Sequence, residues 1–308
     1  MTAHRLLERR LLFVTGKGGV GKTSVSVALA RQAVRAGKRT LLVEMDDKGA
    51  LARLFGSTDL TFEAREVEPG LHAMRMTTEE SLREYIRLFV SNPLVSTVGP
   101  LARILDFVAN AAPGVKEILA VGKLCWEVRE EHYDIVIVDA EATGHIVAQI
   151  DAPSILSGLV QVGVIREQSK WMQEILRDAA RTGVVVVSTP EEMPVIETHQ
   201  LINEIEERTQ VSIAAVVANR SPRVVLQERD IESFNTLLDN APGAVLEAPA
   251  RLVQLALQRR ATATMHLTSL AARANQSGVP FLNLSEVGGA DDRVVVDALT
   301  ESLGAELS

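Results

Sequence analysis

The chain has 308 residues, 46% of them hydrophobic, so it is long and apolar enough to bury a large core, which excludes a disordered protein. Its 40 acidic and 32 basic residues give a formal net charge of −8 without long charged runs, which excludes an electrostatic footprint for nucleic acid. The single cysteine, Cys125, excludes an internal disulfide and is typical of a reducing compartment, so we expect a cytoplasmic protein.

Short runs rich in β-branched residues recur along the chain. They lie at residues 11–14, 40–45, 135–138, 184–187, 213–217 and 279–284, and each is followed by a stretch with helical spacing. Strands that are apolar at every position are buried on both faces. The sequence therefore predicts an α/β fold with a doubly wound, mostly parallel sheet and helices on both sides. No apolar run approaches the roughly 20 residues of a membrane-spanning helix.

Almost ninety residues separate the second and third runs, far more than one crossover needs. Residues 61–76 alternate in a way that predicts an extra strand, whereas residues 79–89 and 100–128 have helical spacing with a break at Ala112-Pro113-Gly114. A second helical stretch is expected at about residues 150–181. We predict a single domain over residues 1–308, with a helical subdomain formed by about residues 78–130 and 146–181.

The clearest motif lies directly after the first strand. Gly16-Lys17-Gly18-Gly19-Val20-Gly21-Lys22-Thr23 matches the phosphate loop, whose glycines let consecutive N–H groups point at phosphate oxygens and whose following helix adds its positive end. We expect Lys22 to reach the β- and γ-phosphates and Thr23 to offer its hydroxyl to Mg²⁺. The segment predicted to bind ATP is Gly16, Lys17, Gly18, Gly19, Val20, Gly21, Lys22, Thr23 and Ser24.

Lys17 needs an explanation of its own, because cradling phosphates does not require a second lysine in the loop. A flexible cation at this position could reach the nucleotide of a facing subunit and neutralise charge in the transition state, which would make hydrolysis depend on dimerisation. The alternative is a solvated surface lysine. We therefore predict that Lys17 and Lys22 both contribute to catalysis.

Acidic residues follow two of the apolar strands. Asp139 ends the strand at residues 135–138, where we expect it to support Mg²⁺ beside the phosphate loop, unless it only caps a helix. Asp46 and Asp47 follow the strand at residues 40–45. Asp46 is the candidate for orienting the attacking water; Asp47 could serve instead, and either could be a helix cap.

With Lys17 and Lys22 together, the loop has the deviant form, and the chain resembles the ArsA family of arsenite-pump ATPases and targeting factors for tail-anchored membrane proteins. Division-site and chromosome-partitioning ATPases share the loop, so the narrower resemblance rests on further segments. Residues 139–145, D-A-E-A-T-G-H, are similar to the family's D-x-A-P-T-G-H switch, and residues 113–117 to its P-G-x-x-E helical segment. Residues 190–198 are similar to its P-E-x-x-x-x-x-E-T stretch.

The resemblance implies a nucleotide-gated dimer that uses ATP and Mg²⁺. It implies that Asp46 activates water, that Asp139 serves magnesium, and that Glu191 approaches nucleotide near the dimer interface. It also implies that Asn219 contacts adenine, which an amide could do through paired hydrogen bonds, although an asparagine after a strand is also common in turns.

Three departures from the family bear on the function. The family's arsenite site needs several cysteines, and its targeting factors commonly close their dimer with a C-x-x-C zinc pair, whereas this chain has one cysteine. Glu141-Ala142 stands where the family has a small residue and proline. The extra carboxylate of Glu141 either needs a cation nearby, such as Lys17 of a partner, or points into solvent.

Three functions remain open at this point. The first is an ATPase switch, a homodimer or a heterodimer with a paralogue, that handles a protein client or membrane partner. The second is a regulatory or pseudo-ATPase subunit of a heterodimer, and the third, least favoured, is the energising subunit of an arsenite pump. Apolar positions within residues 88–108 could line a client groove, but we expect them to form ordinary helical core, because the inserted region is not rich in methionine.

Overall fold

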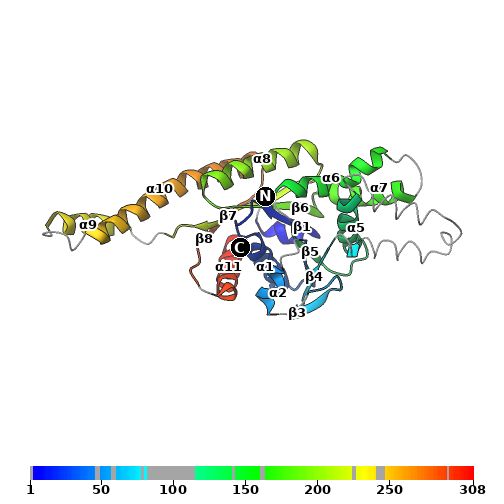
Figure 1. Ribbon diagram of the computed structural model, residues 1–308, viewed down its shortest axis with the longest axis horizontal. Coiled ribbons are helices and arrows are strands. Elements are labelled where there is room, and N and C mark those ends of the chain that lie inside the picture. Colours follow the sequence, from blue (N-terminus) through cyan, green and yellow to red (C-terminus); the bar gives the residue numbers. More distant parts are fainter. Residues whose placement is uncertain are drawn as a thin grey trace.

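An eight-stranded sheet forms the centre of the protein in the computed structural model (Figure 1). The structure describes residues 3–45, 49–56, 60–77, 80–81, 115–140, 143–159, 164–223, 227–240, 247–289 and 291–308. The strand order is β3-β4-β2-β5-β1-β6-β7-β8. The strands are β1 (Leu11–Gly16), β2 (Thr40–Glu44), β3 (Arg65–Glu68), β4 (Leu71–Arg75), β5 (Ile135–Asp139), β6 (Thr182–Ser188), β7 (Ile213–Ser221) and β8 (Phe281–Ser285).

Every neighbouring pair of strands is parallel except β3 and β4. Strand β1 lies between β5 and β6, with Leu11 opposite Val136 on one side and Thr182 on the other. All six residues of β1 are buried, because parallel strands with crossover helices are covered on both faces. The predicted α/β class is confirmed.

Helices cover the two faces of the sheet. The helical elements are η1 (Ala3–Glu8), α1 (Lys22–Arg35), α2 (Ala50–Phe55), α5 (Val115–Arg129), α6 (Thr143–Leu159), α7 (Val164–Arg177), α8 (Glu192–Arg208), α9 (Glu228–Asn240), α10 (Glu247–Gln276) and α11 (Asp292–Leu307). Alternate strand residues face opposite layers, so Leu11 and Phe13 pack in the core with α5 to α8 and α10. Leu12 and Val14 pack in the core with α1 and α11.

The chain departs from the predicted elements in two places. Residues 61–76 form two strands, β3 and β4, joined at a turn through Gly70, whose φ is 77°. The helical stretch expected at residues 150–181 is two helices, α6 and α7, and α6 begins earlier, at Thr143. Most of the predicted insertion, including Pro113 and Gly114 and the apolar positions within residues 88–108, lies outside the described residues. The division into a domain and a helical subdomain stays a prediction.

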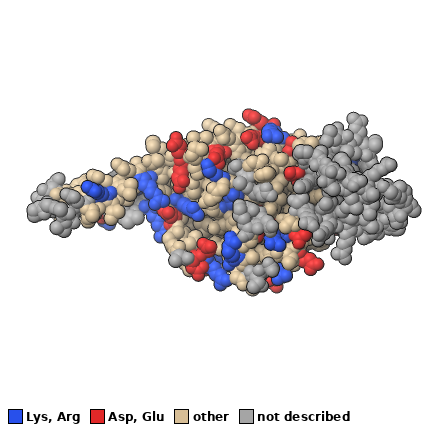
Figure 2. Space-filling model, in the orientation of Figure 1, with Lys and Arg blue, Asp and Glu red and all other residues tan. Residues whose placement is uncertain are grey.

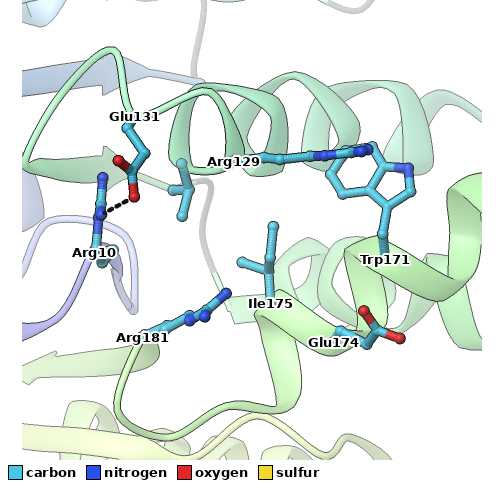
Figure 3. Close-up of a pocket in the computed structure, with 8 residues that line it drawn as sticks. Arg10, Arg129, Glu131, Trp171, Glu174, Ile175 and Arg181 are labelled. Carbon is cyan, nitrogen blue, oxygen red and sulfur yellow. Dashed lines mark hydrogen bonds and ion pairs between the residues drawn. The ribbon is translucent and has the colours of Figure 1, made fainter.

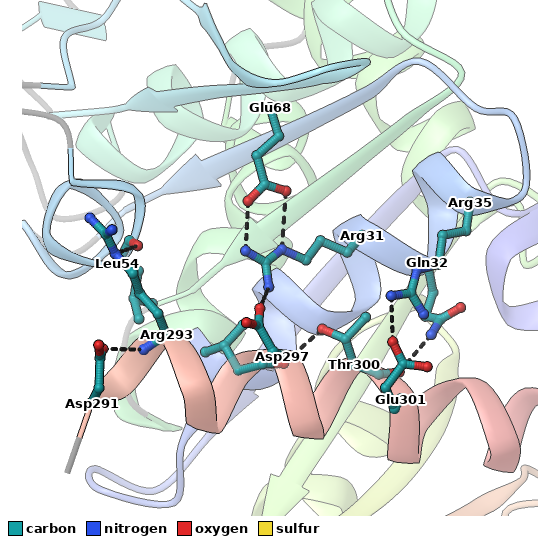
Figure 4. Close-up of polar contacts among 11 residues, drawn as sticks. Arg31, Gln32, Arg35, Leu54, Glu68, Asp291, Arg293, Asp297, Thr300 and Glu301 are labelled. Carbon is teal, nitrogen blue, oxygen red and sulfur yellow. Dashed lines mark hydrogen bonds and ion pairs between the residues drawn. The ribbon is translucent and has the colours of Figure 1, made fainter. Parts of the chain in front are cut away.

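A polar network fixes α1, the helix that follows the phosphate loop (Figure 4). Arg31 donates from Nε and Nη2 to the carboxylate of Glu68 at 3.0 and 2.6 Å and from Nη1 to Asp297 of α11 at 2.6 Å. Gln32 Nε2 donates to the carbonyl oxygen of Thr300 at 2.6 Å. The C-terminal helix, α11, therefore holds α1 against the sheet, and this fixes the position of the helix that follows the phosphate loop.

Helix α10 carries α9 away from the sheet as a projecting arm (Figure 1). From residue 248 to residue 276 it contains four arginines and no acidic residue. On the face shown in Figure 2, acidic and basic side chains are interspersed over the body, and Lys and Arg are more frequent toward the base of the arm. None of the helices described is both long and apolar enough to span a bilayer.

Candidate nucleotide site

The loop between β1 and α1 begins with a glycine that the sheet requires. Gly16 lies opposite Val187 of β6 in the strand register. Its φ is 152°, and a Cβ built on it would collide with the carbonyl oxygen of Val187. Glycine is therefore required where the loop leaves the sheet. The first residue of the loop is held fixed by the sheet, at the carboxyl end of the central strand.

A second fixed point lies at the other end of the loop, where Gly21 is the N-cap of α1 with φ 91° and ψ 30°. A Cβ on Gly21 would collide with Nδ2 of Asn219. That amide donates to the carbonyl oxygen of Val20 at 2.8 Å, and its Oδ1 accepts from the backbone N–H of Arg220 at 3.0 Å. Asn219 is 4% exposed, so the structure places it beneath the loop, where it holds the backbone.

The two loop lysines have different surroundings. Nζ of Lys22 donates to the carbonyl oxygen of Lys17 at 3.3 Å, across the loop. The Lys17 ammonium forms an ion pair with Oε1 of Glu197, on α8 of the same chain. Glu197 belongs to the P-E-x-x-x-x-x-E-T stretch singled out in the sequence, but its pairing with Lys17 was not predicted. In this conformation Lys17 is held by a residue of its own chain.

Thr23 and Asp139 meet at the start of α1. The Thr23 hydroxyl donates to Oδ2 of Asp139 at 2.6 Å, and the Ser26 hydroxyl lies 3.3 Å from Oδ1. Asp139 is 4% exposed, and burial raises its pKa to about 6, although the bond from Thr23 and the charge of Lys22 act in the opposite direction. A hydroxyl oxygen next to a carboxylate oxygen is a donor set that suits Mg²⁺. The two residues predicted to serve the metal are thus brought together.

Sequence reasoning missed one carboxylate at this edge, that of Glu44. It is the last residue of β2, lies opposite Asp139 in the register, and is 1% exposed. Its Oε1 accepts a hydrogen bond from the backbone N–H of Ala50, at the start of α2, at 2.6 Å. The negative charge of Glu44 also contributes to the raised pKa of Asp139. A charged residue inside an otherwise apolar run was the signal that could have found it.

The structure describes only some of the remaining residues that were predicted to form the site. Glu191 lies at the N-cap of α8, just after β6, and makes no side-chain capping bond. Val20 is buried in the core with α1, and Ser24 lies in the first turn of that helix. Asp46, Asp47 and Glu141 lie outside the described residues. The roles predicted for these residues stay predictions.

Comparison with known proteins identifies ATPases as relatives of this chain. A sequence model described as anion-transporting ATPase matches residues 9–170 and 161–238. The chain is 28% identical over 323 residues to ATPase BagA of Mycobacterium tuberculosis, an alignment that covers 98% of this chain and 94% of that protein. It is 27% identical over 258 residues to putative arsenical pump-driving ATPase 2 of Aquifex aeolicus, which covers 73% of this chain and 83% of that one.

A shorter sequence alignment relates the chain to a yeast protein. It is 34% identical over 161 residues to ATPase get3 of Schizosaccharomyces japonicus, covering 50% of this chain and 48% of that protein. The residues matched by the sequence model include the phosphate loop, Asp139 and Asn219.

Proposed function

The chain belongs to the anion-transporting ATPase family, and from this premise we propose that it is a Mg²⁺-dependent ATPase that works as a dimer and changes conformation with its nucleotide. The observation that carries the proposal is the contact of Thr23 with Asp139, at 2.6 Å, beside Lys22. Three groups proposed to serve a nucleoside triphosphate and its metal ion, from β5 and the start of α1, lie at one edge of the sheet.

The phosphate loop supplies the binding step. Backbone N–H groups between Gly16 and Gly21 would hold the phosphate oxygens, and Lys22 would neutralise charge on the β- and γ-phosphates. Thr23 would ligate Mg²⁺ and Asp139 would steady its water shell, and the bound ion would supply positive charge to the phosphates. Asp46 is proposed to orient the attacking water.

Lys17 is proposed to act on the nucleotide of the partner subunit. Its pair with Glu197 supports a two-state arrangement, because Glu197 neutralises the charge that Lys17 would bring to a partner's nucleotide. ATP would then favour the state in which Lys17 has left Glu197. Glu191, at the start of the same helix, is proposed to approach the nucleotide near the dimer interface. Asn219 is still proposed to contact adenine, which would require its buried amide, now bonded to Val20 and Arg220, to become accessible when ATP binds.

The work coupled to hydrolysis is proposed to be the handling of a protein client or a membrane partner in the cytoplasm. The alternative is a regulatory subunit in a heterodimer. An arsenite-pump role is less favoured because Cys125 is the one cysteine of the chain, is fully buried, and has a pKa raised by that burial. A buried thiol that stays protonated is a poor ligand for a metalloid.

The test is to measure the mass of the purified chain in solution with Mg²⁺ and no nucleotide, ADP or ATP, alongside its turnover. We expect a dimer with ATP and a turnover that rises with protein concentration. Lys17→Ala should still bind ATP but lose most turnover, whereas Lys22→Ala should lose ATP affinity as well. Rapid hydrolysis by a monomer would contradict the dimer, and ATP binding without turnover would favour the regulatory subunit.

A further inference from the structure

A cavity of about 330 Å³ lies at the edge of the sheet opposite to the phosphate loop (Figure 3). Its residues come from segments that precede strands: Arg10 precedes β1, Glu131 lies before β5, and Arg181 directly precedes β6. The phosphate loop follows β1, so the six residues of that strand, at about 3.3 Å each, place roughly 20 Å between the two sites. The cavity is thus separate from the nucleotide site, and its volume suits a small molecule.

Three guanidinium groups from three separate segments of the chain line this cavity. Arg10 and Arg181 come from the sheet edge and Arg129 from the end of α5. An apolar wall completes the lining, made of Val128, Trp171 and Ile175. Figure 3 shows Arg10 and Arg181 on one side of Ile175, with Arg129 lying over the Trp171 ring on the other. The cavity thus combines basic groups with an apolar surface.

Each arginine contacts a neighbouring group, and Arg10 is held most firmly because it makes two hydrogen bonds. Arg10 donates from Nη1 to Glu131 at 3.1 Å and from Nη2 to the carbonyl oxygen of Tyr133 at 3.0 Å. The guanidinium of Arg129 lies 5.0 Å from the centre of the Trp171 ring, and Arg181 pairs with Asp178 at 3.2 Å. Side chains that are already positioned lose little conformational entropy when a ligand binds.

The arginines also have hydrogen-bonding capacity to spare. Nε of Arg10 is buried, and among the described residues it has no acceptor. No carboxylate of the described part of the chain pairs with Arg129. Arg9, the neighbour of Arg10 in the sequence, is 4% exposed and bonds to the carbonyl oxygen of Ala179 at 2.9 Å, with no carboxylate among the described residues in contact. Glu131 and Glu174 also line the cavity, and Asp178 pairs with Arg181, so the excess positive charge comes from Arg9 and the groups without a carboxylate partner, above all Arg129.

We propose that this cavity binds a small molecule that carries a phosphate or carboxylate group. Guanidinium groups form paired, charge-assisted hydrogen bonds with both kinds of oxyanion. The apolar part of the ligand would rest against Val128 and Ile175 and the accessible edge of Trp171. The ligand would bind without displacing nucleotide, because the two sites lie at opposite edges of the sheet.

The test uses inorganic pyrophosphate as the phosphoryl probe and citrate as the carboxylate probe, titrated by calorimetry at constant ionic strength. The full chain carries Lys22→Ala, so that the phosphate loop does not account for the binding. Trp126→Phe leaves Trp171 as the one tryptophan, and its fluorescence reports whether the probe enters the cavity. We expect at least one probe to bind and to change Trp171 fluorescence, and the probe that binds identifies the oxyanion.

The variant that tests the site is Arg129→Gln combined with Arg181→Gln, and we expect it to weaken binding at least tenfold. The matched control is Arg229→Gln, which removes the same kind of charge from α9, where the side chain is 85% exposed, and should change affinity by less than twofold. The proposal fails if neither probe binds, if the double variant binds within twofold of its parent, or if Arg229→Gln weakens binding as much.

Discussion

Lys17 of the phosphate loop and Glu197 of α8 form an ion pair within a single chain, although 180 residues separate them. Their side chains are 32% and 29% exposed. Partly exposed pairs of this kind stabilise a protein by only about 0.2–1 kcal/mol. Lys17 can therefore leave Glu197 at little cost, which suits a residue proposed to act in a partner's site.

Replacing Glu197 with Gln removes the carboxylate that competes for Lys17. If Lys17 acts across the dimer, turnover at low protein concentration should rise by roughly 1.5- to 5-fold, the factor that corresponds to 0.2–1 kcal/mol. The measurement is steady-state ATP hydrolysis over a range of protein concentrations. Glu204→Gln, an exposed change on the same helix, serves as control and should leave turnover unchanged. A fall below half of the wild-type rate would contradict a competing role for Glu197.

Alanine substitutions at Gly21 and Gly19 separate the effect of a collision with Asn219 from the effect of backbone strain. Their φ angles are 91° and 88°, but a Cβ on Gly21 collides with Asn219 whereas one on Gly19 meets nothing within 4 Å. Gly21→Ala should therefore lower ATP affinity and the free energy of unfolding more than Gly19→Ala, by about 1–3 kcal/mol in stability. Urea unfolding and ATP titration measure both quantities.

A double-mutant cycle sharpens this prediction. In an Asn219→Ala background the collision is relieved, so the additional cost of Gly21→Ala over Gly19→Ala should largely disappear. An additional cost that persists in full would show that Asn219 is not its cause.

The raised pKa of Asp139 should make the proposed Mg²⁺-dependent nucleotide binding sensitive to pH. Burial brings this pKa to about 6, and an ionised carboxylate serves the metal better. ATP affinity in the presence of Mg²⁺ should therefore rise as pH increases through about 6 and level off above it. Asp139→Asn should bind more weakly and show a smaller rise, because only the titration of the ATP phosphate remains. An identical pH profile for wild type and Asp139→Asn would contradict this role.

The stability of the nucleotide-free protein should change in the opposite direction. The pKa of Asp139 is 3.8 in an ordinary environment and about 6 in the folded chain, so the folded state holds its proton more tightly. This contribution is fully present below about pH 4 and is lost as pH rises through about 6, up to about 3 kcal/mol. Unfolding by urea at several pH values should show Asp139→Asn gaining stability relative to wild type over this range. A constant difference would contradict it.

Arg31 and Arg35 provide a matched pair on α1. Arg31 donates to both carboxylate oxygens of Glu68 and to Asp297, and its side chain is 20% exposed. Arg35 pairs with Glu301, and these two side chains are 51% and 71% exposed. Lysine cannot reproduce the forked bonds of Arg31. Arg31→Lys should lower the free energy of unfolding by about 1–2 kcal/mol and Arg35→Lys by less than about 0.5 kcal/mol. Equal losses in urea unfolding would contradict the importance of the fork.

The fold and the loop were predictable because their signals are local. Six apolar runs predicted six of the seven strands that have a parallel neighbour. Burial on both faces leaves no alternation in the central strands, whereas the edge strand β8 alternates between buried and exposed residues. The ArsA resemblance drawn from the motifs is confirmed by the match over residues 9–238. The meeting of Thr23 with Asp139 followed from a general rule, that parallel strands end at one edge of the sheet.

Other relationships depended on which strands and helices become neighbours. Glu44 is significant because β2 lies beside β5 in register, which puts its carboxylate opposite Asp139. Asn219 bonds to Val20 although 199 residues separate them. Arg10 and Arg181 lie next to each other, at the edge of the sheet opposite the phosphate loop, because β1 pairs with β6. By itself the sequence determined the class of fold, the family and the phosphate loop, because hydrophobic period and glycine spacing act over a few residues. Only the tertiary structure decided that Lys17 pairs with Glu197 and that three arginines surround one cavity, because such contacts are set by strand order and helix packing.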